Sequence, residues 1–310
     1  MAFTAKDVKA LREKTGVGMM ECKKALTEAD GDMDKAIDFL REKGLAAAAK
    51  KASRIAAEGV VLSYYDKAAK KAVIVEVNSE TDFVAKNEKF TNFVEGVAKT
   101  ILACAPADVE ALADCKYDGT DKTVTETLNE LILSIGENMK IRRFETMDGV
   151  VSTYVHAGGS VGVLVGFDAD AAMLDNADFN EMAKDVAMQV AAMSPAYLDE
   201  ASVPADVVAH EKEILAIQIK EDPKMANKPE QVIEKIAAGK MSKYYKENCL
   251  VDQEFVKATN HESVGQYVAD VAKKLGADVK ISGFVRFAKG EGLQKKEENF
   301  AEEIAKAVKG

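Results

Sequence analysis

Residues 72–86 read Ala-Val-Ile-Val-Glu-Val-Asn-Ser-Glu-Thr-Asp-Phe-Val-Ala-Lys. The first six are mostly β-branched or apolar, which is typical of a buried or half-buried strand, and residues 88–105 carry the apolar spacing of an amphipathic helix. Phe83 falls on the connection between them, with polar neighbours, as in a loop that inserts into another molecule. The spacing equally allows Phe83 to fold back as a hydrophobic staple on its own helix, with Thr81 or Asp82 as N-cap.

A second copy of this strand pattern lies 90 residues further along the chain. Residues 59–64 (GVVLSY) align with 149–154 (GVVSTY), and residues 73–75 (VIV) align with 163–165 (VLV). Each copy predicts a hairpin followed by a helix, so we expect an α+β fold with two similar core subdomains, each containing a small antiparallel sheet. The second copy has Ala171-Ala172-Met173 where the first has Thr81-Asp82-Phe83. A shared scaffold therefore does not explain the first loop.

The N-terminal residues predict a compact module of three short helices. Thr4 and Asp7 form a capping-box pattern, a second helix is expected from Met19 to about Ala29, and a third runs from Asp32 to Lys43. Gly44 is expected to end the third helix. The following Ala- and Lys-rich residues 45–57 have few large side chains and are interpreted as a helical linker.

These patterns divide the chain into five parts. Heptad steps in residues 206–248 predict an antiparallel helical hairpin of coiled-coil type, inserted in the second subdomain, although the same spacing also allows two ordinary core helices. The expected divisions are 1–55 for the N-terminal module and start of the linker, 56–148 for the first core subdomain, 149–205 with 249–293 for the second, 206–248 for the hairpin, and 294–310 for a C-terminal amphipathic helix.

Composition and charge exclude several classes of protein. The 310 residues carry a net charge of -10, and residues 56–310 hold 43 acidic against 30 basic side chains, so nucleic acid is not an expected partner. The chain begins without a basic-then-apolar leader and has no run of about 18 apolar residues, as a membrane span would require. A cytoplasmic, membrane-free location is expected. The four cysteines form no C-x-x-C pair and are interpreted as reduced, apolar fillers.

No enzymatic site stands out. His210 and His261 each precede a glutamate, but no second histidine follows at metal-binding spacing. The glycine-rich residues 158–162 precede a strand instead of a helix, so we interpret them as a hairpin turn and not as a phosphate cradle. We therefore expect no catalytic activity of its own, no cofactor and no metal.

Two long stretches carry a resemblance to a known family. They are residues 11–26 (LREKTGVGMMECKKAL) and 76–86 (EVNSETDFVAK), with weaker agreement at 135–138 (IGEN), His156, 283–287 (GFVRF) and 290–292 (GEG). On these residues the chain resembles, over essentially its whole length, the elongation factor Ts family of guanine-nucleotide exchange factors for the GTPase elongation factor Tu.

The resemblance implies an architecture, a partner and contact residues. The N-terminal module would be of the ubiquitin-associated type, and the helical hairpin could mediate homodimerisation. Arg12, Met19, Met20 and Lys23 would contact the nucleotide-binding domain of elongation factor Tu. Asp82 and Phe83, flanked by Thr81 and Val84, would enter between two of its helices near the magnesium site and promote GDP release. Ile135, His156 and Val256 would face its third domain.

Two other classes of function remain open at this point. A non-catalytic adaptor could use the three-helix module to bind a different folded partner. A metabolic enzyme could hold a ligand in a pocket between the two core subdomains, and a ligand would then stabilise it without any protein partner.

Overall fold

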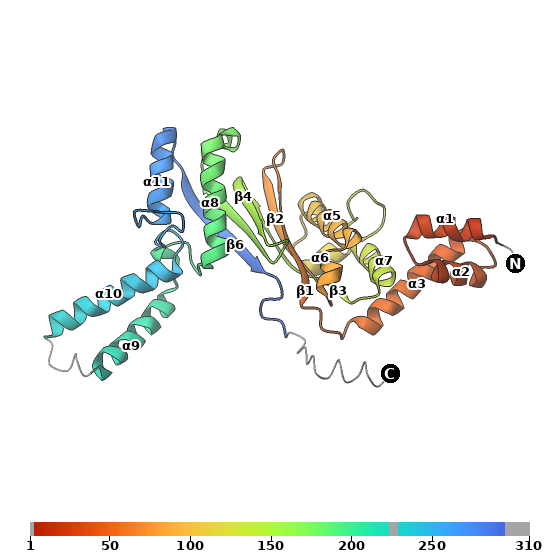
Figure 1. Cartoon of the computed structure of the whole chain (residues 1–310), viewed down its shortest axis with the longest axis horizontal. Helices are drawn as coiled ribbons and strands as arrows, with labels where there is room; N and C mark the ends of the chain where they lie inside the picture. Colours follow the sequence, from red (N-terminus) through yellow and green to blue (C-terminus); the bar gives the residue numbers. More distant parts are fainter. Residues whose placement is uncertain (1–2, 223–228, 295–310) are drawn as a thin grey trace.

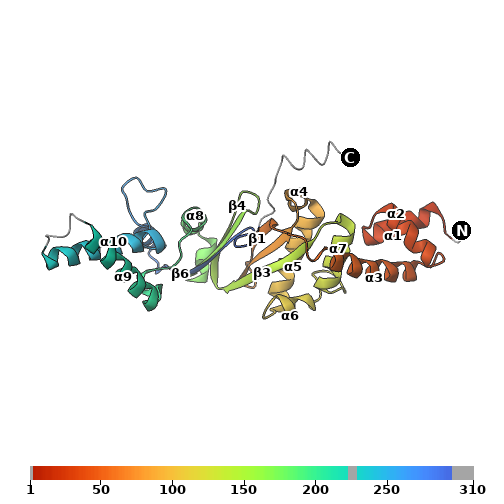
Figure 2. The same ribbon diagram turned by 90° about the horizontal axis from the view of Figure 1, so that it is seen from below.

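The computed structural model describes residues 3–222 and 229–294. In this range the chain is an elongated α+β structure with eleven α-helices and two three-stranded antiparallel sheets, as the sequence predicts. A three-helix module lies at one end and a pair of long helices lies at the other, with the two sheets between them (Figures 1 and 2). None of the described helices is long and apolar enough to cross a membrane.

The N-terminal module consists of α1 (Ala5–Thr15), α2 (Met19–Glu28) and α3 (Met33–Lys51). The predicted caps are present: Thr4 and Asp7 form a capping box, and the Asp32 carboxylate accepts from the backbone N–H groups of Asp34 and Lys35. The three helices close around their own buried cluster, whose members are Val8, Leu11, Val17, Cys22, Ala25, Leu26, Ala36 and Leu40.

The predicted end of α3 at Gly44 is wrong. The helix continues to Lys51, because residues 45–51 are alanine, leucine and lysine, all strong helix formers. The absent side chain at Gly44 serves packing instead. A Cβ there would lie 3.3 Å from the backbone oxygen of Asn129, so the glycine lets α3 closely approach the helix α7 (Val124–Ile135).

The first sheet has the order β1 (Glu58–Asp66), β2 (Lys71–Ser79), β3 (Met139–Asp148). The central strand β2 is buried on both faces, and its side chains alternate. Val73, Val75 and Val77 face a core formed with α5 (Glu88–Cys104) and α7 (Val124–Ile135), whereas Ala72 and Ile74 face the second sheet. The short helices α4 (Asp82–Ala85) and α6 (Val109–Ala113) flank α5. The strand β3 was not anticipated from the sequence.

The second sheet has the order β4 (Val150–His156), β5 (Val161–Asp168), β6 (Lys280–Ala288). Its outer face is covered by α8 (Ala177–Met193) and α11 (Val264–Leu275), and β5 is followed by the 3-10 helix η1 (Ala171–Asp175). The glycine-rich residues after β4 form a hairpin turn, as predicted. The long helices α9 (Ala205–Glu221) and α10 (Glu230–Asn248) pack side by side, after the 3-10 helix η2 (Glu200–Ser202).

The two sheets pack face to face, which gives four layers: helices, sheet, sheet, helices (Figure 2). The space between the sheets is filled by side chains from both, namely Val61, Ala72, Ile74, Val151, Leu164 and Phe287. This filled interface does not suit the alternative of a ligand pocket between the subdomains.

The internal repeat extends further than the strand pattern indicated. Both sheets carry the same register shift, between Glu76 and Val77 in β2 and 90 residues later in β5. Val77 pairs with Ile141, and its counterpart Phe167 pairs with Ile281. We call each sheet with its covering helices a lobe, the first containing β1–β3 and the second β4–β6. In the second half of each lobe, corresponding positions are therefore 140 residues apart. The helices obey this offset, since α7 and α11 have matching N-caps (Thr123 and Ser263) and matching glycine C-caps (Gly136 and Gly276).

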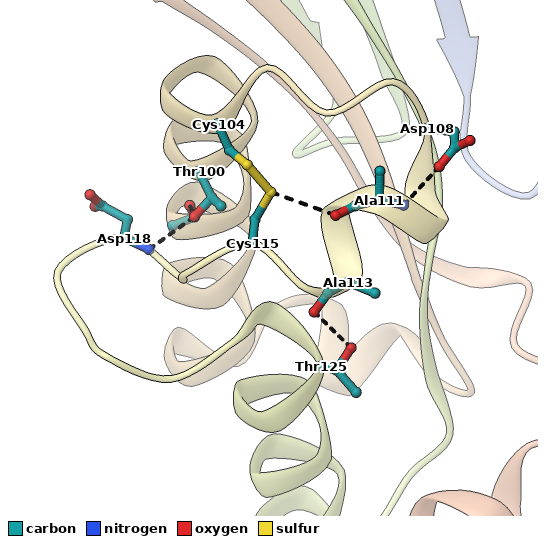
Figure 3. Close-up of a disulfide and its surroundings, with 9 residues drawn as sticks. Thr100, Cys104, Asp108, Ala111, Ala113, Cys115, Asp118 and Thr125 are labelled. Atoms are coloured by element: carbon teal, nitrogen blue, oxygen red, sulfur yellow. Dashed lines mark hydrogen bonds between the residues drawn. A yellow bond between two sulfur atoms is a disulfide. The ribbon is translucent and has the colours of Figure 1, made fainter.

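The expectation that all four cysteines are reduced is wrong. Cys104 and Cys115 form a disulfide with a Cα–Cα distance of 6.4 Å, whereas Cys22 and Cys249 are free and buried (Figure 3). The pairing is local: α5 ends at Cys104, Ala105 takes a left-handed conformation, and the chain returns through α6. Asp108 caps α6 through the backbone N–H of Ala111 (Figure 3). The predicted C-terminal helix lies, after residue 294, outside the described residues.

Candidate partner-binding site

The loop singled out by the sequence forms the short helix α4, and its aromatic ring faces solvent. The Thr81 hydroxyl caps this helix by accepting from the backbone N–H of Val84 at 3.4 Å. Val84 and Ala85 are buried in the core of the first lobe, while Phe83 is 81% exposed. The staple interpretation is therefore wrong for the ring, although Thr81 is the N-cap. Val84 serves as an internal anchor, and its side chain is not on the surface as a direct partner contact would require.

The second lobe provides an internal control for this exposure. At the position equivalent to Phe83 it has Met173, on η1, which is half-buried and packs against the core of its own lobe. The same scaffold thus covers an apolar side chain in one copy and leaves a larger one uncovered in the other. Exposing a phenylalanine ring forgoes about 1.5–3 kcal/mol of burial energy, so the first copy gives up stability at this point.

Asp82 places a negative charge beside the exposed ring. The Lys86 ammonium donates to its Oδ2 at 2.7 Å, one helical turn away. This hydrogen bond lowers the pKa of Asp82, and the positive charges of Lys86 and Lys289 act in the same direction. The tip of α4 therefore presents an ionised carboxylate and an aromatic ring side by side.

The predicted residues of the N-terminal module are all on its surface. Arg12 and Lys23 are exposed, and Met19 and Met20 at the start of α2 are 41% and 74% exposed. The two methionines are thus not part of the module core.

The start of the module's second helix is held next to the helix that follows α4. The backbone oxygen of Gly16 accepts from Lys89 Nζ and from Ser134 Oγ, both at 3.0 Å. Lys89 lies in the first turn of α5, which begins three residues after α4 ends. The structure therefore brings the Met19–Met20 surface and the Phe83 loop to neighbouring parts of the molecule.

The turn after His156 lies at the same end of the sheets as α4. His156 is exposed at the end of β4, and its Nδ1 is 3.0 Å from the Tyr154 hydroxyl. The turn reaches across to the first sheet, where the Val61 N–H donates to the Gly159 oxygen at 2.8 Å. Since β1 pairs there with the end of β2, His156 lies on the side of the molecule that carries α4.

The two remaining predicted residues are placed differently. Ile135, the last residue of α7, is half-buried against the first-lobe core. Val256 is 51% exposed in the loop between α10 and α11, and the side-chain oxygen of buried Gln189 accepts from its backbone N–H at 2.9 Å. That loop and α4 are well separated along the molecule (Figure 2). Val256 therefore does not join the surface around Phe83.

Sequence reasoning missed the residues that hold these surfaces in place. Glu137, Lys89 and Gln189 each bond a loop that is distant in sequence, and no local spacing reveals such contacts. Glu137 lies in residues 135–138, which carry part of the family resemblance, and directly after a glycine helix cap, but neither feature points to Thr81.

The site offers binding surfaces more than reactive groups. No group of three or more histidine, cysteine or carboxylate side chains in residues 3–222 and 229–294 is placed to hold a metal ion. Burial raises the pKa of the Cys22 thiol and raises that of Cys249 to about 11, so both stay protonated at neutral pH. What the described surface presents is an exposed aromatic ring, a carboxylate and paired methionines.

Comparisons with known proteins give one consistent answer. The family model described as "Elongation factor TS" matches residues 80–291. Proteins called elongation factor Ts from Clostridium kluyveri and from Clostridium perfringens strain SM101 are each 50% identical, over 99% and 98% of both chains respectively. One from Clostridium botulinum strain Alaska E43 is 46% identical over 99% of both chains.

Proposed function

The chain belongs to the elongation factor Ts family, and from this premise we propose that it binds elongation factor Tu in its GDP-bound form and promotes GDP release, which allows GTP to reload. It acts by protein contact, without catalytic residues or a cofactor of its own, and works in the cytoplasm. The observation that carries the proposal is the solvent-exposed Phe83 ring on a short helix anchored from beneath.

The proposal includes a division of labour along the chain. Residues 1–55 form a ubiquitin-associated-like module, 56–148 the first core subdomain, 149–205 with 249–293 the second, 206–248 a coiled-coil hairpin that can dimerise the factor, and 294–310 a C-terminal helix. The module and α4 act on the nucleotide-binding domain of the GTPase through Arg12, Met19, Met20, Lys23, Asp82 and Phe83. Thr81 and Val84 flank this pair and hold α4 in place, and Ile135, His156 and Val256 contact the third domain.

Thermodynamic linkage explains how such a factor releases nucleotide. If it binds the nucleotide-free GTPase more tightly than the GDP-bound form, it must weaken GDP binding by the same ratio. Each tenfold weakening requires about 1.4 kcal/mol of coupling free energy. The factor therefore needs contacts that form fully only when the nucleotide's own contacts are disturbed.

Phe83 is suited to supply a large part of this coupling. Moving its exposed ring into an apolar pocket contributes about 1.5–3 kcal/mol, which corresponds to one or two factors of ten in GDP affinity. The adjacent Asp82 carboxylate would bring negative charge toward the magnesium and phosphate site and disturb its electrostatic balance. The Lys86 partner keeps this carboxylate ionised before binding.

A direct mixing experiment tests the function. Elongation factor Tu loaded with a fluorescent GDP is mixed with excess unlabelled GDP, with and without the purified chain. We expect the chain to accelerate the fluorescence decay in proportion to its concentration. No acceleration over a broad concentration range, with the chain folded, would contradict the proposal and favour the adaptor alternative.

A further inference from the structure

The base of the Phe83 loop is held by one carboxylate from a distant part of the chain. Glu137 accepts two hydrogen bonds from Thr81: one from its backbone N–H to Oε2 at 3.0 Å, and one from its hydroxyl to Oε1 at 2.7 Å. We call this pair of bonds the Glu137 brace. Hydrogen bonds to an ionised carboxylate are among the stronger ones in proteins, and two on one residue fix its orientation as well as its position.

The brace also determines how Thr81 caps α4. A hydroxyl has one proton to donate and two lone pairs. Because the Thr81 proton points at Glu137, a lone pair is left to accept from the Val84 N–H, which is the cap of the helix that carries Phe83. The remaining polar group of Thr81, its backbone oxygen, accepts from the buried Ser79 hydroxyl at 2.9 Å. The residue is thus held through every polar group it has.

A second carboxylate links the same two segments in the opposite direction. Glu80, next to Thr81, accepts from the backbone N–H of Asn138, next to Glu137, at 2.6 Å. The Asn138 side chain in turn donates to the Arg54 backbone oxygen at 2.8 Å. The loop before α4 and the turn after α7 are therefore tied by carboxylates from both sides.

The internal repeat shows that the brace accompanies the exposed ring. In the second lobe the counterpart of Thr81 is Ala171, and the counterpart of Glu137 is Ala277, which follows Gly276 as Glu137 follows Gly136. Neither alanine can form the side-chain hydrogen bonds. The second lobe, which covers Met173, has alanine at both positions. The first lobe, which exposes Phe83, has both polar partners.

From this we propose that Glu137 is a positioning residue for nucleotide exchange: through Thr81 it holds α4 so that Phe83 meets its pocket in a fixed orientation. This inference rests on the proposed function and deepens it. Burial anchors α4 only through Val84 and Ala85, on the side opposite the ring. A rigid wedge transmits its binding energy to the partner, whereas a mobile one loses part of it in being ordered.

The position of the ring is measured without the partner. The chain contains no tryptophan, so Phe83→Trp places a single indole at the tip of α4. In this background we expect Glu137→Ala to lower the fluorescence anisotropy of the indole. Glu130→Ala is the matched control, because it removes a carboxylate on α7, the helix just before Glu137, that pairs with Lys122 at 2.6 Å and has no bond to Thr81, and it should leave the anisotropy unchanged. An unchanged anisotropy in Glu137→Ala would overturn the brace.

Exchange kinetics then test whether Glu137 acts through Phe83. Glu137→Ala should slow fluorescent-GDP release from elongation factor Tu by about tenfold at a subsaturating factor concentration, and Glu137→Gln, which retains one acceptor oxygen, should recover part of the rate. In a Phe83→Ala background Glu137→Ala should have no further effect. An equal loss in both backgrounds would overturn the proposal, because Glu137 would then act independently of the ring.

Failure of the proposed function and failure of the positioning role of Glu137 give different results. If the unaltered chain releases no GDP, the proposed function fails, while the anisotropy still decides whether Glu137 orders the loop. If the unaltered chain is active and Glu137→Ala, folded by circular dichroism, is equally active, only the positioning role fails.

Discussion

Phe83 and Met173 occupy the same place in two copies of one lobe, but they face different surroundings. Phe83 is 81% exposed and Met173 packs against its own core. We therefore expect Phe83→Ala to leave the midpoint of thermal unfolding nearly unchanged, whereas Met173→Ala should destabilise the chain by at least about 1 kcal/mol. Thermal unfolding followed by circular dichroism compares the two. Equal destabilisation would mean that the ring is packed within the chain.

The buried residue Glu76 makes the stability of the chain depend on pH. The carboxylate is fully buried and paired with Arg142 at 3.1 Å and Arg143 at 2.6 Å. Burial alone would raise the pKa of Glu76, but hydrogen bonds from the Gly290 backbone, Asn78 and the two arginines outweigh it and lower the pKa below the ordinary 4.5. A lowered carboxyl pKa contributes stability that is present above the ordinary value and is lost as pH falls through the lowered one.

The expected outcome is a pH-dependent effect of Glu76→Gln. At pH 7 the change should lower the free energy of unfolding by about 2–3 kcal/mol, since two partly solvated arginines lose their buried partner. At an acid pH below the lowered pKa of Glu76 the difference from the unaltered chain should shrink, because neither chain then carries the charge. Urea unfolding at the two pH values measures it. A difference that stays constant with pH would contradict the pairing.

Among the elements, the segment between α5 and α7 is held by a covalent link. The Cys104–Cys115 disulfide spans 11 residues of sequence and closes the loop that contains α6 (Figure 3). Closing a loop of this size stabilises a protein by up to about 3 kcal/mol. We expect Cys104→Ser/Cys115→Ser to unfold at lower temperature than the unaltered, oxidised chain. Thiol titration in denaturant without reductant should find two free thiols, those of Cys22 and Cys249, and four would contradict the bond.

The sequence predicts elements well where one local signal decides them. The caps at Thr4 and Asp32 and the repeat of hairpin and helix are present in the structure. Prediction from the sequence fails where contacts between distant segments determine the structure. Gly44 looks like a helix stop, but it is used for close packing on α7. The disulfide depends on the chain returning through α6, which the cysteine spacing does not show.

The candidate site follows the same division. The spacing around Phe83 allowed either an exposed ring or a hydrophobic staple, and only the structure excludes the staple. Val84 follows the ring directly in sequence, yet it is buried, because successive positions on a short helix face different sides. Glu137 lies 56 residues from Thr81 and could not be connected with it by spacing.

Across the whole molecule, the N-terminal module is docked on the first lobe and does not hang on a free linker. Arg41 pairs with Glu126 at 2.6 Å, Leu133 of α7 packs on the module core, and Gly44 lies against Asn129. This docking fixes the distance between the module surface and Phe83.

Enlarging Gly44 should loosen the docking. We expect Gly44→Leu to push α3 away from α7 and to increase the radius of gyration measured by small-angle X-ray scattering. Gly239→Leu is the matched control, because this helical glycine has no atom within 4 Å of its missing side chain. If Gly44→Leu leaves the scattering unchanged, the module is not held by this contact.

The most direct test of the exchange mechanism is the effect of Phe83→Ala on fluorescent-GDP release from elongation factor Tu at matched factor concentrations. Met193→Ala, which removes a 48% exposed apolar side chain at the end of α8, is the control. Loss of the ring should slow release by roughly 10- to 100-fold, the kinetic equivalent of about 1.5–3 kcal/mol, while the control keeps the original rate. An unchanged rate in Phe83→Ala, with unchanged thermal stability, would contradict the central role of the ring.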